Sequence, residues 1–297
     1  MYTIKHAAAR AGISVELLRA WERRYGIVEP IRTPAGYRLY DDDAIARIRA
    51  MRRLIGSGWS PRLAAHAVVE QGPSAADAMV DAPEIAADVT AEANGPSAEL
   101  AERFVAAAAT LDGTAVDAVL DDMFGRGSFE RVIDELVLPA VVALGQAWAE
   151  RRISVAAEHA ASHAVVRRLG AALEAAGMNP PPQGSVMVGL PAGSRHDIGA
   201  LAFAAALRRA GLPVVYLGAD LPTEDWISAT REARAAVIGV VTPADVASAR
   251  SLVAQLGAAN PRLLIALGGR AAPELAGTMR LPDGLSDAVS EVRRALA

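Results

Sequence analysis

The chain has 297 residues, of which 52% are hydrophobic and 22% charged, a composition typical of a globular protein with room for two or three domains. It contains no cysteine, which excludes disulfides, cysteine zinc sites and thiol nucleophiles. No apolar run approaches the roughly 18 residues of a membrane span, and no signal peptide is evident, so we expect a cytoplasmic protein without a membrane partner. The net charge of −4 is uneven, with +6 over residues 1–62 and −10 beyond them, which predicts that the amino-terminal part binds a polyanion.

The first 30 residues predict two short helices joined by a tight turn. Apolar residues with helical spacing run from Ile4 to Ala11, and Gly12 can end this first helix. Ser14 is a suitable cap for a second helix, whose buried face would contain Leu18, Trp21 and Tyr25. Two helices around a glycine turn make a helix-turn-helix, in which the second helix can enter the major groove of DNA.

A hairpin and a third helix are expected to follow this pair. Arg19 and Arg23 lie four residues apart on a different face of the second helix, with Arg24 beside them. The segment RTPAGYRLYD, at residues 32–41, has the pattern of a β-hairpin that turns at residues 34–36, and a third helix is expected from about Asp42. The order of these elements predicts a winged helix-turn-helix.

Residues 2–62 resemble a MerR-family winged helix-turn-helix throughout, with LRAWERRYG and GYRLY as the most specific elements. The resemblance implies that the recognition helix and the wing contact DNA through four residues: Arg19, Arg23, Tyr37 and Arg38. The alternative is that these arginines only solvate a helical face. The spacing, the local positive charge and the family pattern agree in favouring DNA contact.

The remainder of the chain divides into three parts. Residues 73–97 are rich in Ala, Asp, Pro and Ser and are predicted to link the DNA-binding domain of residues 1–72 to the rest. Residues 98–178 have helical periodicity with little Pro or Gly, as expected for a four-helix bundle. Residues 179–297 alternate short runs of Val, Ile and Leu with helical segments, which is typical of a Rossmann-like domain with a parallel sheet. The predicted fold class is therefore multidomain, α and α/β.

The bundle contains one group of candidate site residues. Trp148 is expected to end one helix, and Ser154 can cap the next, which then carries Glu158 and His159 in its early turns. A short connection makes these helices antiparallel neighbours and brings the three side chains close together. His159 continues an apolar stripe on the second helix and is therefore expected to face inward; the stripe contains Val155, Ser162, Val166, Leu169 and Leu173.

The α/β part contains the second group. His196 lies between the first predicted strand and the helix after it, at the carboxyl edge where open parallel sheets bind ligands. Gly199 is expected to allow close approach of that helix, and Gly268 with Gly269 to leave bare backbone for a ligand at the end of another strand. No GxGxxG motif follows any strand, so a dinucleotide is a poor fit.

Together these residues resemble the cobalamin-binding modules of methionine synthase type, and most closely those of CarH-like photoreceptor regulators. The resemblance covers nearly the whole chain apart from the linker and implies adenosylcobalamin as cofactor. In that family a His-x-x-Gly loop supplies the lower ligand of cobalt, which carries over to His196 and Gly199. The glycine pair would hold the nucleotide tail, and a Trp-x9-Glu-His pattern would cover the upper face and the adenosyl group, here Trp148, Glu158 and His159.

Three positions depart from the pattern of this family. Ser194 stands two residues before the histidine, where the family has an acid, and a hydroxyl supports an imidazole ligand less well. A family serine on the third strand is absent, and Thr242 is the nearest hydroxyl, which makes it a candidate for cofactor contact. Ala149 follows the tryptophan, where CarH-like proteins can carry a histidine that ligates cobalt in the lit state.

These features predict a DNA-binding transcriptional regulator that acts as a repressor. Bound adenosylcobalamin and light are expected to control it, which would make it a photoreceptor. Because MerR-type heads act in pairs on symmetric half-sites, we expect a homo-oligomer, dimer or tetramer, on double-stranded operator DNA. A light-independent cobalamin sensor and a regulator without cofactor or with an altered chromophore remain open as alternatives. No catalytic residue is assigned and no enzyme is expected, because the chain lacks the substrate domain that cobalamin-dependent turnover needs.

Overall fold

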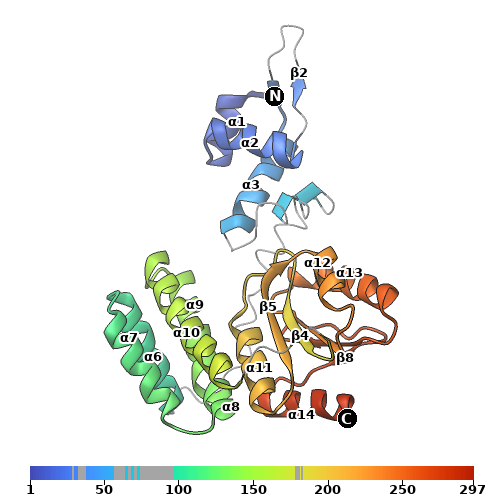
Figure 1. Ribbon diagram of the computed structural model, residues 1–297. Helices are drawn as coiled ribbons and strands as arrows, with labels where there is room; N and C mark the ends of the chain where they lie inside the picture. The colour runs from blue at the N-terminus through green and yellow to red at the C-terminus, as the bar shows by residue number, and fades with distance from the viewer. Residues whose placement is uncertain are drawn as a thin grey trace. The chain divides into compact units, whose positions relative to one another are not determined.

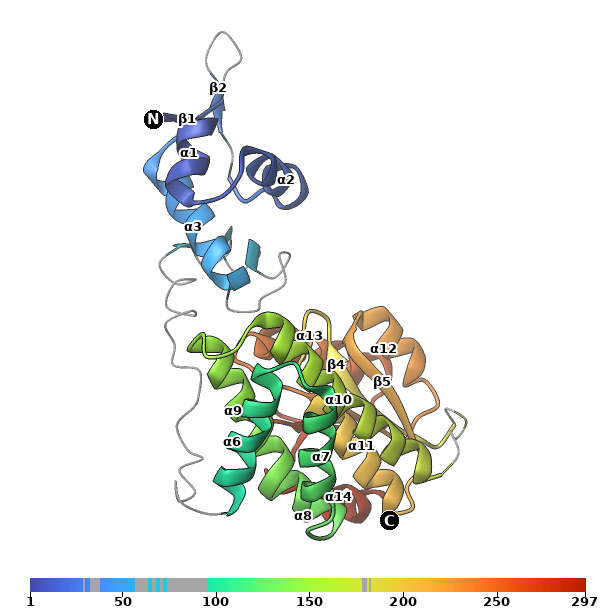
Figure 2. The same ribbon diagram turned by 90° about the vertical axis from the view of Figure 1, so that its left-hand side faces the viewer.

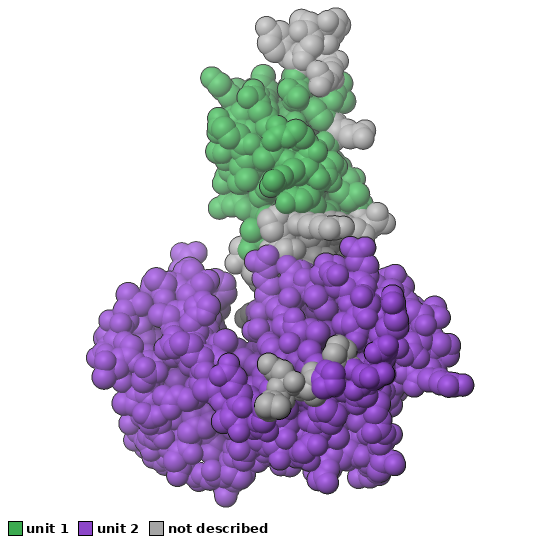
Figure 3. All heavy atoms as spheres, viewed as in Figure 1, with its two compact units in different colours: residues 1–87 green, residues 88–297 purple. Residues whose placement is uncertain are grey.

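The computed structural model describes residues 1–28, 30–32, 38–56, 64–65, 68–69, 72–73, 96–177, 181 and 183–297. The chain forms two compact units, residues 1–87 and residues 88–297, which are shown in different colours in Figure 3. Each unit has a hydrophobic core of its own and is considered separately.

The described part of the first unit includes three longer helices and a small antiparallel sheet (Figure 1), and residues 64–65 and 68–69 are also helical. The helices are α1 (Ile4–Ala11), α2 (Val15–Tyr25) and α3 (Asp42–Gly56). The strands β2 (Ile31–Arg32) and β3 (Arg38–Tyr40) pair as the predicted hairpin requires, while its turn at residues 33–37 lies outside the described residues. The strand β1 (Tyr2–Thr3), which was not predicted, pairs with the other side of β3.

Local sequence explains the boundary between α1 and α2. Gly12 adopts a left-handed conformation with φ 71° and ends α1, as glycine at this position commonly does. Ser14 caps α2, because its Oγ accepts a hydrogen bond from the backbone N–H of Leu17 at 3.1 Å. Leu18 and Trp21 are buried on the inner face of α2, so the predicted helix-turn-helix is confirmed.

The second unit begins with a helical bundle (Figure 2). Within residues 96–177 the chain forms four helical rods, as predicted, and the third is continuous through α8 (Phe129–Val132), η1 (Ile133–Val137) and α9 (Leu138–Ala149). The other rods are α6 (Pro96–Ala109), α7 (Gly113–Phe124) and α10 (Val155–Ala175). The segment η1 is a π-helical turn, a local widening of the helix that is found often at functional sites.

The third rod is also an exception to the expectation about membrane spans. Among the described residues, one helix, Phe129–Ala149, is long and apolar enough to cross a membrane, with a mean hydropathy of 1.5. The core helix of a globular domain passes the same test, so a single helix of this kind is a weak indication. Ile133, Val137 and Leu144 of this rod are buried in the core of the second unit.

The α/β part contains a five-stranded parallel sheet in the order β5-β4-β6-β7-β8. The four predicted strands are β4 (Val186–Pro191), β5 (Val214–Leu221), β6 (Ala235–Gly239) and β7 (Leu264–Gly268). A short fifth strand, β8 (Met279–Arg280), was not predicted. Because the chain runs from β4 outward to β5 and then returns to the other side of β4, the order of the strands reverses between β4 and β6. Such a switch point is where open sheets of this type bind ligands.

Helices cover both faces of the sheet. Residues alternate between the faces, so that Val186 and Val188 of β4 join one core while Met187 between them joins the other. The first core includes the helices α11 (Ile198–Arg209) and α14 (Leu285–Leu296), together with the bundle. The second core contains α12 (Thr223–Ala229) and α13 (Asp245–Ala259).

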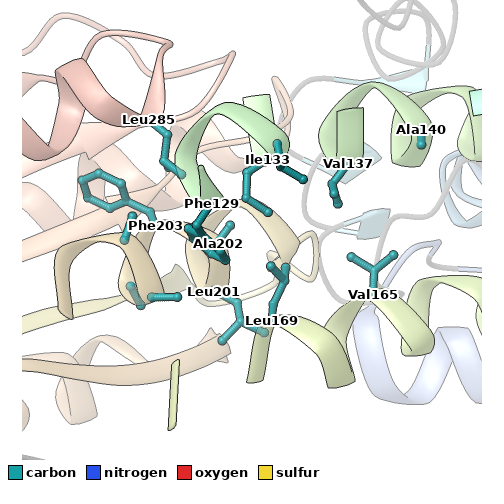
Figure 4. Close-up of a cluster of buried hydrophobic side chains, with 14 of the residues drawn as sticks. Phe129, Ile133, Val137, Ala140, Val165, Leu169, Leu201, Ala202, Phe203 and Leu285 are labelled. Atoms are coloured by element: carbon teal, nitrogen blue, oxygen red, sulfur yellow. The ribbon is translucent and has the colours of Figure 1, made fainter. Parts of the chain in front are cut away.

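The bundle and the sheet domain therefore share one core, and Figure 4 shows part of it. Ile133 and Leu169 of the bundle lie close to Leu201 and Ala202 of α11 in this view. The helix α10 packs along α11 in Figures 1 and 2, which accounts for most of the junction.

Arg208 of α11 holds the C-terminal end of α10 at this junction. The side chain is buried, and four hydrogen bonds of 2.8–3.4 Å run from its guanidinium to three main-chain carbonyls, those of Val214 (from Nε and Nη2), Leu173 and Gly177. Burial lowers the pKa of Arg208, and a buried cation needs such acceptors to offset the loss of hydration.

A second polar contact joins the bundle to α14. Asp134, in the π-helical turn, accepts a hydrogen bond from the backbone N–H of Leu285 at 2.8 Å, at the first residue of α14. The contact satisfies one of the free N–H groups of that helix end. Burial raises the pKa of Asp134, and this effect outweighs the opposing effect of the Leu285 N–H.

Candidate functional site

In the first unit, arginines from the recognition helix and the wing line one hollow of about 450 Å³. Arg19 and Arg23 project from α2 and are exposed, and Arg38 comes from β3. The structure therefore brings together three of the four predicted DNA-contacting residues, whereas Tyr37 lies outside the described residues. Three cations around a concave surface suit the phosphates of a polyanion.

A carboxylate in the same hollow organises two of its neighbours. Glu22 of α2 accepts a hydrogen bond from the hydroxyl of Tyr40 and pairs with the Nε of Arg38 at 3.4 Å. Burial and the carboxylate of Glu22 raise the pKa of Tyr40 well above its usual range. The sequence prediction did not assign a role to Glu22 or Tyr40, although both belong to the quoted motifs. Glu22 lies one helical turn after Arg19, and Tyr40 lies two strand positions after Arg38.

In the second unit, predicted site residues follow three neighbouring strands at the carboxyl edge of the sheet. His196 follows β4, Thr242 follows β6, and Gly268 with Gly269 ends β7. The first two flank the switch point of the sheet. The predicted position of His196, in the loop between the first strand and α11, is confirmed, and its side chain is exposed.

The loop of His196 is fastened to β5. The backbone N–H of Gly193 donates to Oδ1 of Asp220 at 2.6 Å, and the backbone N–H of Asp220 donates to the carbonyl of Ser194 at 2.9 Å. On the other side of the histidine, the hydroxyl of Tyr216 donates to Asp197 at 2.9 Å, and burial raises the pKa of Tyr216. Asp220 and Tyr216 were missed because no local pattern pairs a strand residue with a loop residue 19 or 27 positions earlier.

The loop of Thr242 has an anchor of a different kind. Asp245, at the start of α13, is buried, and its Oδ2 accepts three hydrogen bonds at 2.8–3.1 Å, from the backbone N–H groups of Val241 and Thr242 and from the hydroxyl of Thr242. The hydroxyl of Thr242 therefore already has a partner within its own loop.

The glycines of the site have structural roles that differ from those predicted from the sequence. A Cβ at Gly199 would meet open space, so this glycine does not serve close helix packing. A Cβ at Gly268 would lie 3.3 Å from Leu281, and one at Gly269 would lie 2.5 Å from the carbonyl oxygen of Val240. Gly269 also has φ +104°, so it is required by the packing of its own chain, not by bare space left for a ligand.

The predicted inward position of His159 is wrong. Its side chain is 64% exposed, and Val155 one turn earlier is exposed as well. The buried face of α10 begins instead with Ala157, Ala161 and Ala164, and the predicted stripe joins it only at Leu169 and Leu173. These alanines face Ala108 of α6 and Val116 of α7 around a small pocket of about 50 Å³.

The other two bundle residues are where the sequence placed them. Trp148 lies at the end of α9, partly buried against the core, and the Ser154 cap of α10 is confirmed by a 3.1 Å hydrogen bond from the N–H of Ala157. Glu158 is held by its neighbours, since Oε1 accepts from Ser162 at 2.7 Å and Oε2 lies 3.0 Å from Nδ1 of His159. Figure 3 shows a notch between the lobe formed by the bundle and the lobe formed by the sheet domain.

Three segments of the chain match known protein families. Residues 2–68 match the MerR HTH family of regulatory proteins. Residues 100–173 and residues 184–289 each match a B12 binding domain. The first match coincides with the winged helix-turn-helix, and the other two coincide with the bundle and the sheet domain.

Individual relatives support the same division. The chain is 34% identical to the HTH-type transcriptional repressor CarH of Myxococcus xanthus, in a match that covers 91% of this chain and 89% of that protein. It is 32% identical to the repressor CarA of the same organism, over 80% of this chain and 75% of that protein. The monomethylamine corrinoid protein of Methanosarcina barkeri shares the fold with a TM-score of 0.53 at 14% identity, covering 66% of this chain and 96% of that chain.

The residues at the carboxyl edge fit a corrin cofactor. His196 presents an exposed imidazole at the switch point, and the adjacent Gly199 leaves open space. Ser194 is 2% exposed, and its Oγ has no partner among the described residues, so the His196 loop contains a polar atom still available to a ligand. The chain belongs to the family of MerR-type regulators with a cobalamin-binding module, represented by CarH and CarA, and it is a cobalamin-dependent DNA-binding transcriptional regulator.

Proposed function

We propose that this regulator is a cytoplasmic repressor and not an enzyme, that it binds adenosylcobalamin, and that light relieves its hold on operator DNA. The observation that carries the proposal is the exposed imidazole of His196 at the switch point of the sheet, beside the open space at Gly199. A single imidazole suffices as protein ligand for a metal that a corrin already holds. Among the described residues, no cluster of three or more His, Asp or Glu side chains offers a metal site of another kind.

In this proposal each assigned residue has a defined contact. His196 would ligate cobalt, Gly199 would leave room for the corrin ring, and the loops of Thr242 and of Gly268–Gly269 would border the nucleotide tail. Trp148, Glu158 and His159 of the bundle would contact the adenosyl group. The hydrogen bond from Ser162 and the contact with His159 hold the carboxylate of Glu158 in one orientation. In that orientation it is suited to accept hydrogen bonds from the hydroxyl groups of the adenosyl ribose.

The bound cofactor supplies a photolabile cobalt–carbon bond, while the protein supplies orientation and surroundings. Contacts of Trp148 and Glu158 with the adenosyl group would fix the N-terminal half of α10 relative to the sheet domain. Loss of these contacts would release that half, because the hydrogen bonds of Arg208 to Leu173 and Gly177 hold α10 at its other end. Such a two-state change in the bundle is a way to alter the assembly of an oligomer on DNA.

Ala149 gives the lit state of this chain a particular character. It is exposed at the end of α9, next to Trp148, and a methyl group cannot ligate cobalt. Alternative ligands from the bundle are His159 and His163, both exposed on α10. We therefore expect a lit state that is differently ligated or less stable, with weaker disassembly of the oligomer.

The test is to load the purified chain with adenosylcobalamin in darkness and to record absorbance and mass before and after green light. We expect a tetramer in darkness, a spectral change on illumination, and a smaller species afterwards. The variant Ala149→His should give a sharper bis-imidazole spectrum and more complete disassembly. A dark monomer at saturating cofactor refutes the proposed control of assembly. A loaded protein whose mass does not respond to light indicates the light-independent sensor, and a failure to retain the cofactor indicates a cofactor-free regulator.

A further inference from the structure

The loop of His196 is braced on both sides of the histidine by one strand, β5. Two residues of the loop, Gly193 and Ser194, are tied to the carboxylate and the backbone N–H of Asp220. Arg195 adds an ion pair with Asp220 at 3.8 Å. These contacts fix the chain immediately before the histidine.

A second contact from the same strand fixes the chain immediately after it. The hydroxyl of Tyr216 donates to Oδ2 of Asp197 at 2.9 Å. Asp197 precedes the first residue of α11 and makes no side-chain capping bond to that helix, so its carboxylate is free to serve this contact. Asp220 and Tyr216 thus hold the positions on either side of His196.

The end of β5 has an unusual backbone that makes this brace possible. Gly218 has φ +84° and Asp220 has φ +55°, and the pairing of β5 with β4 shifts register beside Gly189. A Cβ at Gly189 would lie 3.0 Å from the carbonyl oxygen of Gly218 and 3.2 Å from the buried ring of Trp226, so this close approach requires glycine. A non-glycine residue at positive φ costs roughly 1–2 kcal/mol and persists where surrounding contacts impose it.

The histidine itself has no such support. None of the described residues makes a hydrogen bond to the ring of His196, and Ser194 Oγ, two residues away, has no partner either. The place of the imidazole is therefore set by the loop backbone, and the loop backbone is set by the two contacts from β5.

We propose that Asp220 and Tyr216 are positioning residues that hold the imidazole of His196 in the direction needed to ligate cobalt. The inference rests on the proposed role of His196 and extends it to residues on another strand. Without the brace, the loop would spend part of its time in positions from which the imidazole does not reach the metal, and the ligated fraction would fall by the population of those positions.

The experiment measures ligation directly in the full-length protein. Protein labelled with ¹⁵N is loaded with unlabelled cob(II)alamin, and the cobalt signal is recorded by electron paramagnetic resonance. A protein imidazole on cobalt splits the lines into doublets, whereas the cofactor's own base gives triplets. Retention of the cofactor after gel filtration is measured separately, so that binding and ligation are distinguished.

Asp220→Gly is the informative variant, because glycine adopts φ +55° without strain and only the carboxylate is removed. We expect about a tenfold fall in the ratio of ligated to unligated cobalt, which corresponds to ~1.4 kcal/mol. Asp220→Asn keeps an oxygen that accepts from Gly193 and should restore most of the ligation. Tyr216→Phe should reduce ligation less than Asp220→Gly, and Asp225→Ala, an exposed residue of α12, is the matched control.

The outcomes separate the two proposals. Doublets in the parent together with unchanged doublets in Asp220→Gly and Tyr216→Phe overturn the brace and leave the role of His196 intact. Absence of doublets in the parent overturns the role of His196 and the brace with it. Loss of ligation in both variants, with the cofactor retained and Asp225→Ala unchanged, supports the brace.

Discussion

The arginine-lined hollow of the first unit and the carboxyl edge of the sheet in the second unit are arranged in different ways. In the hollow, side chains position one another, since Glu22 holds both Tyr40 and Arg38 before any ligand is present. At the carboxyl edge of the sheet, Asp220 and Tyr216 of β5 hold the loop on either side of His196, and the ring of His196 itself makes no hydrogen bond among the described residues. A repetitive polyanion such as DNA meets charges arranged in advance, whereas a large rigid cofactor can complete a site whose loops are already in place.

The largest expected effect tests the importance of main-chain geometry in the second unit. Gly269→Ala places a methyl group against the Val240 carbonyl at a backbone angle that alanine rarely adopts. We expect a loss of about 3 kcal/mol in the free energy of unfolding of this unit, measured by urea denaturation. Gly257→Ala in α13 is the control, since nothing lies near its Cβ, and it should be neutral or stabilising. Equal urea midpoints for Gly269→Ala and the parent would contradict the packing argument.

The next effect tests the arginines of the first unit. Arg19→Ala or Arg23→Ala should weaken binding to the preferred operator by roughly 1–3 kcal/mol if the side chain meets a base edge. Both side chains are exposed, so stability should hardly change, in contrast to Gly269→Ala. Fluorescence anisotropy with a selected operator at several salt concentrations gives the affinity and the number of phosphate contacts. Arg24→Ala serves as the control because Arg24 does not line the hollow. Unchanged operator affinity in both Arg19→Ala and Arg23→Ala would show that α2 is not part of the recognition surface.

A smaller effect is expected from the carboxylate that arranges the hollow. Glu22→Gln keeps an acceptor for the hydroxyl of Tyr40 but loses the charge that holds Arg38. Binding to unrelated DNA should rise slightly because a negative charge is removed, while discrimination between operator and unrelated DNA should fall by about 0.5–1 kcal/mol. The ratio of the two affinities is the measurement. A ratio equal to that of the parent would show that the ion pair with Glu22 does not position Arg38 for operator recognition.

The smallest effect concerns pH and the contact between Asp134 and α14. Burial raises the pKa of Asp134 in the folded protein, so its protonated form favours folding, and that contribution is lost as pH rises through the raised pKa. Asp134→Asn mimics the protonated form at every pH. Its melting temperature should exceed that of the parent at pH 7 by no more than about 3 °C, as ~1 kcal/mol produces in a chain of this size, and the difference should shrink towards pH 4. A difference that grows on acidification would reverse the assignment.

Local sequence signals predicted much of the fold and part of the site. Gly12 ends α1 and Ser14 begins α2, as predicted. The apolar runs predicted four of the five strands of the parallel sheet, because these elements depend on nearby residues. The loop position of His196 followed from the same pattern. The orientation of His159 was mistaken, because the prediction followed a stripe of larger apolar residues, whereas the buried face of this half of α10 consists of alanines.

Features that depend on distant residues were not predictable. Asp220 reaches Gly193, 27 residues earlier, because β5 and β4 are neighbours and Asp220 itself has a positive φ near the end of β5. The need for glycine at position 269 arises from Val240, on the connection after another strand. Neither contact leaves a periodic trace in the sequence, so both required the structure.

The hydrogen bonds from Arg208 to main-chain carbonyls have an evolutionary consequence. Its four contacts described above end on main-chain carbonyls, which every type of residue provides. Substitutions at Leu173 or Val214 can therefore leave these hydrogen bonds available, whereas Gly177 has a φ of +134° that favours glycine, and Arg208 is the side chain that must be inherited. Descendants of this chain are free to diversify the surfaces of the bundle that face ligand and partner while the joint between the lobes stays the same.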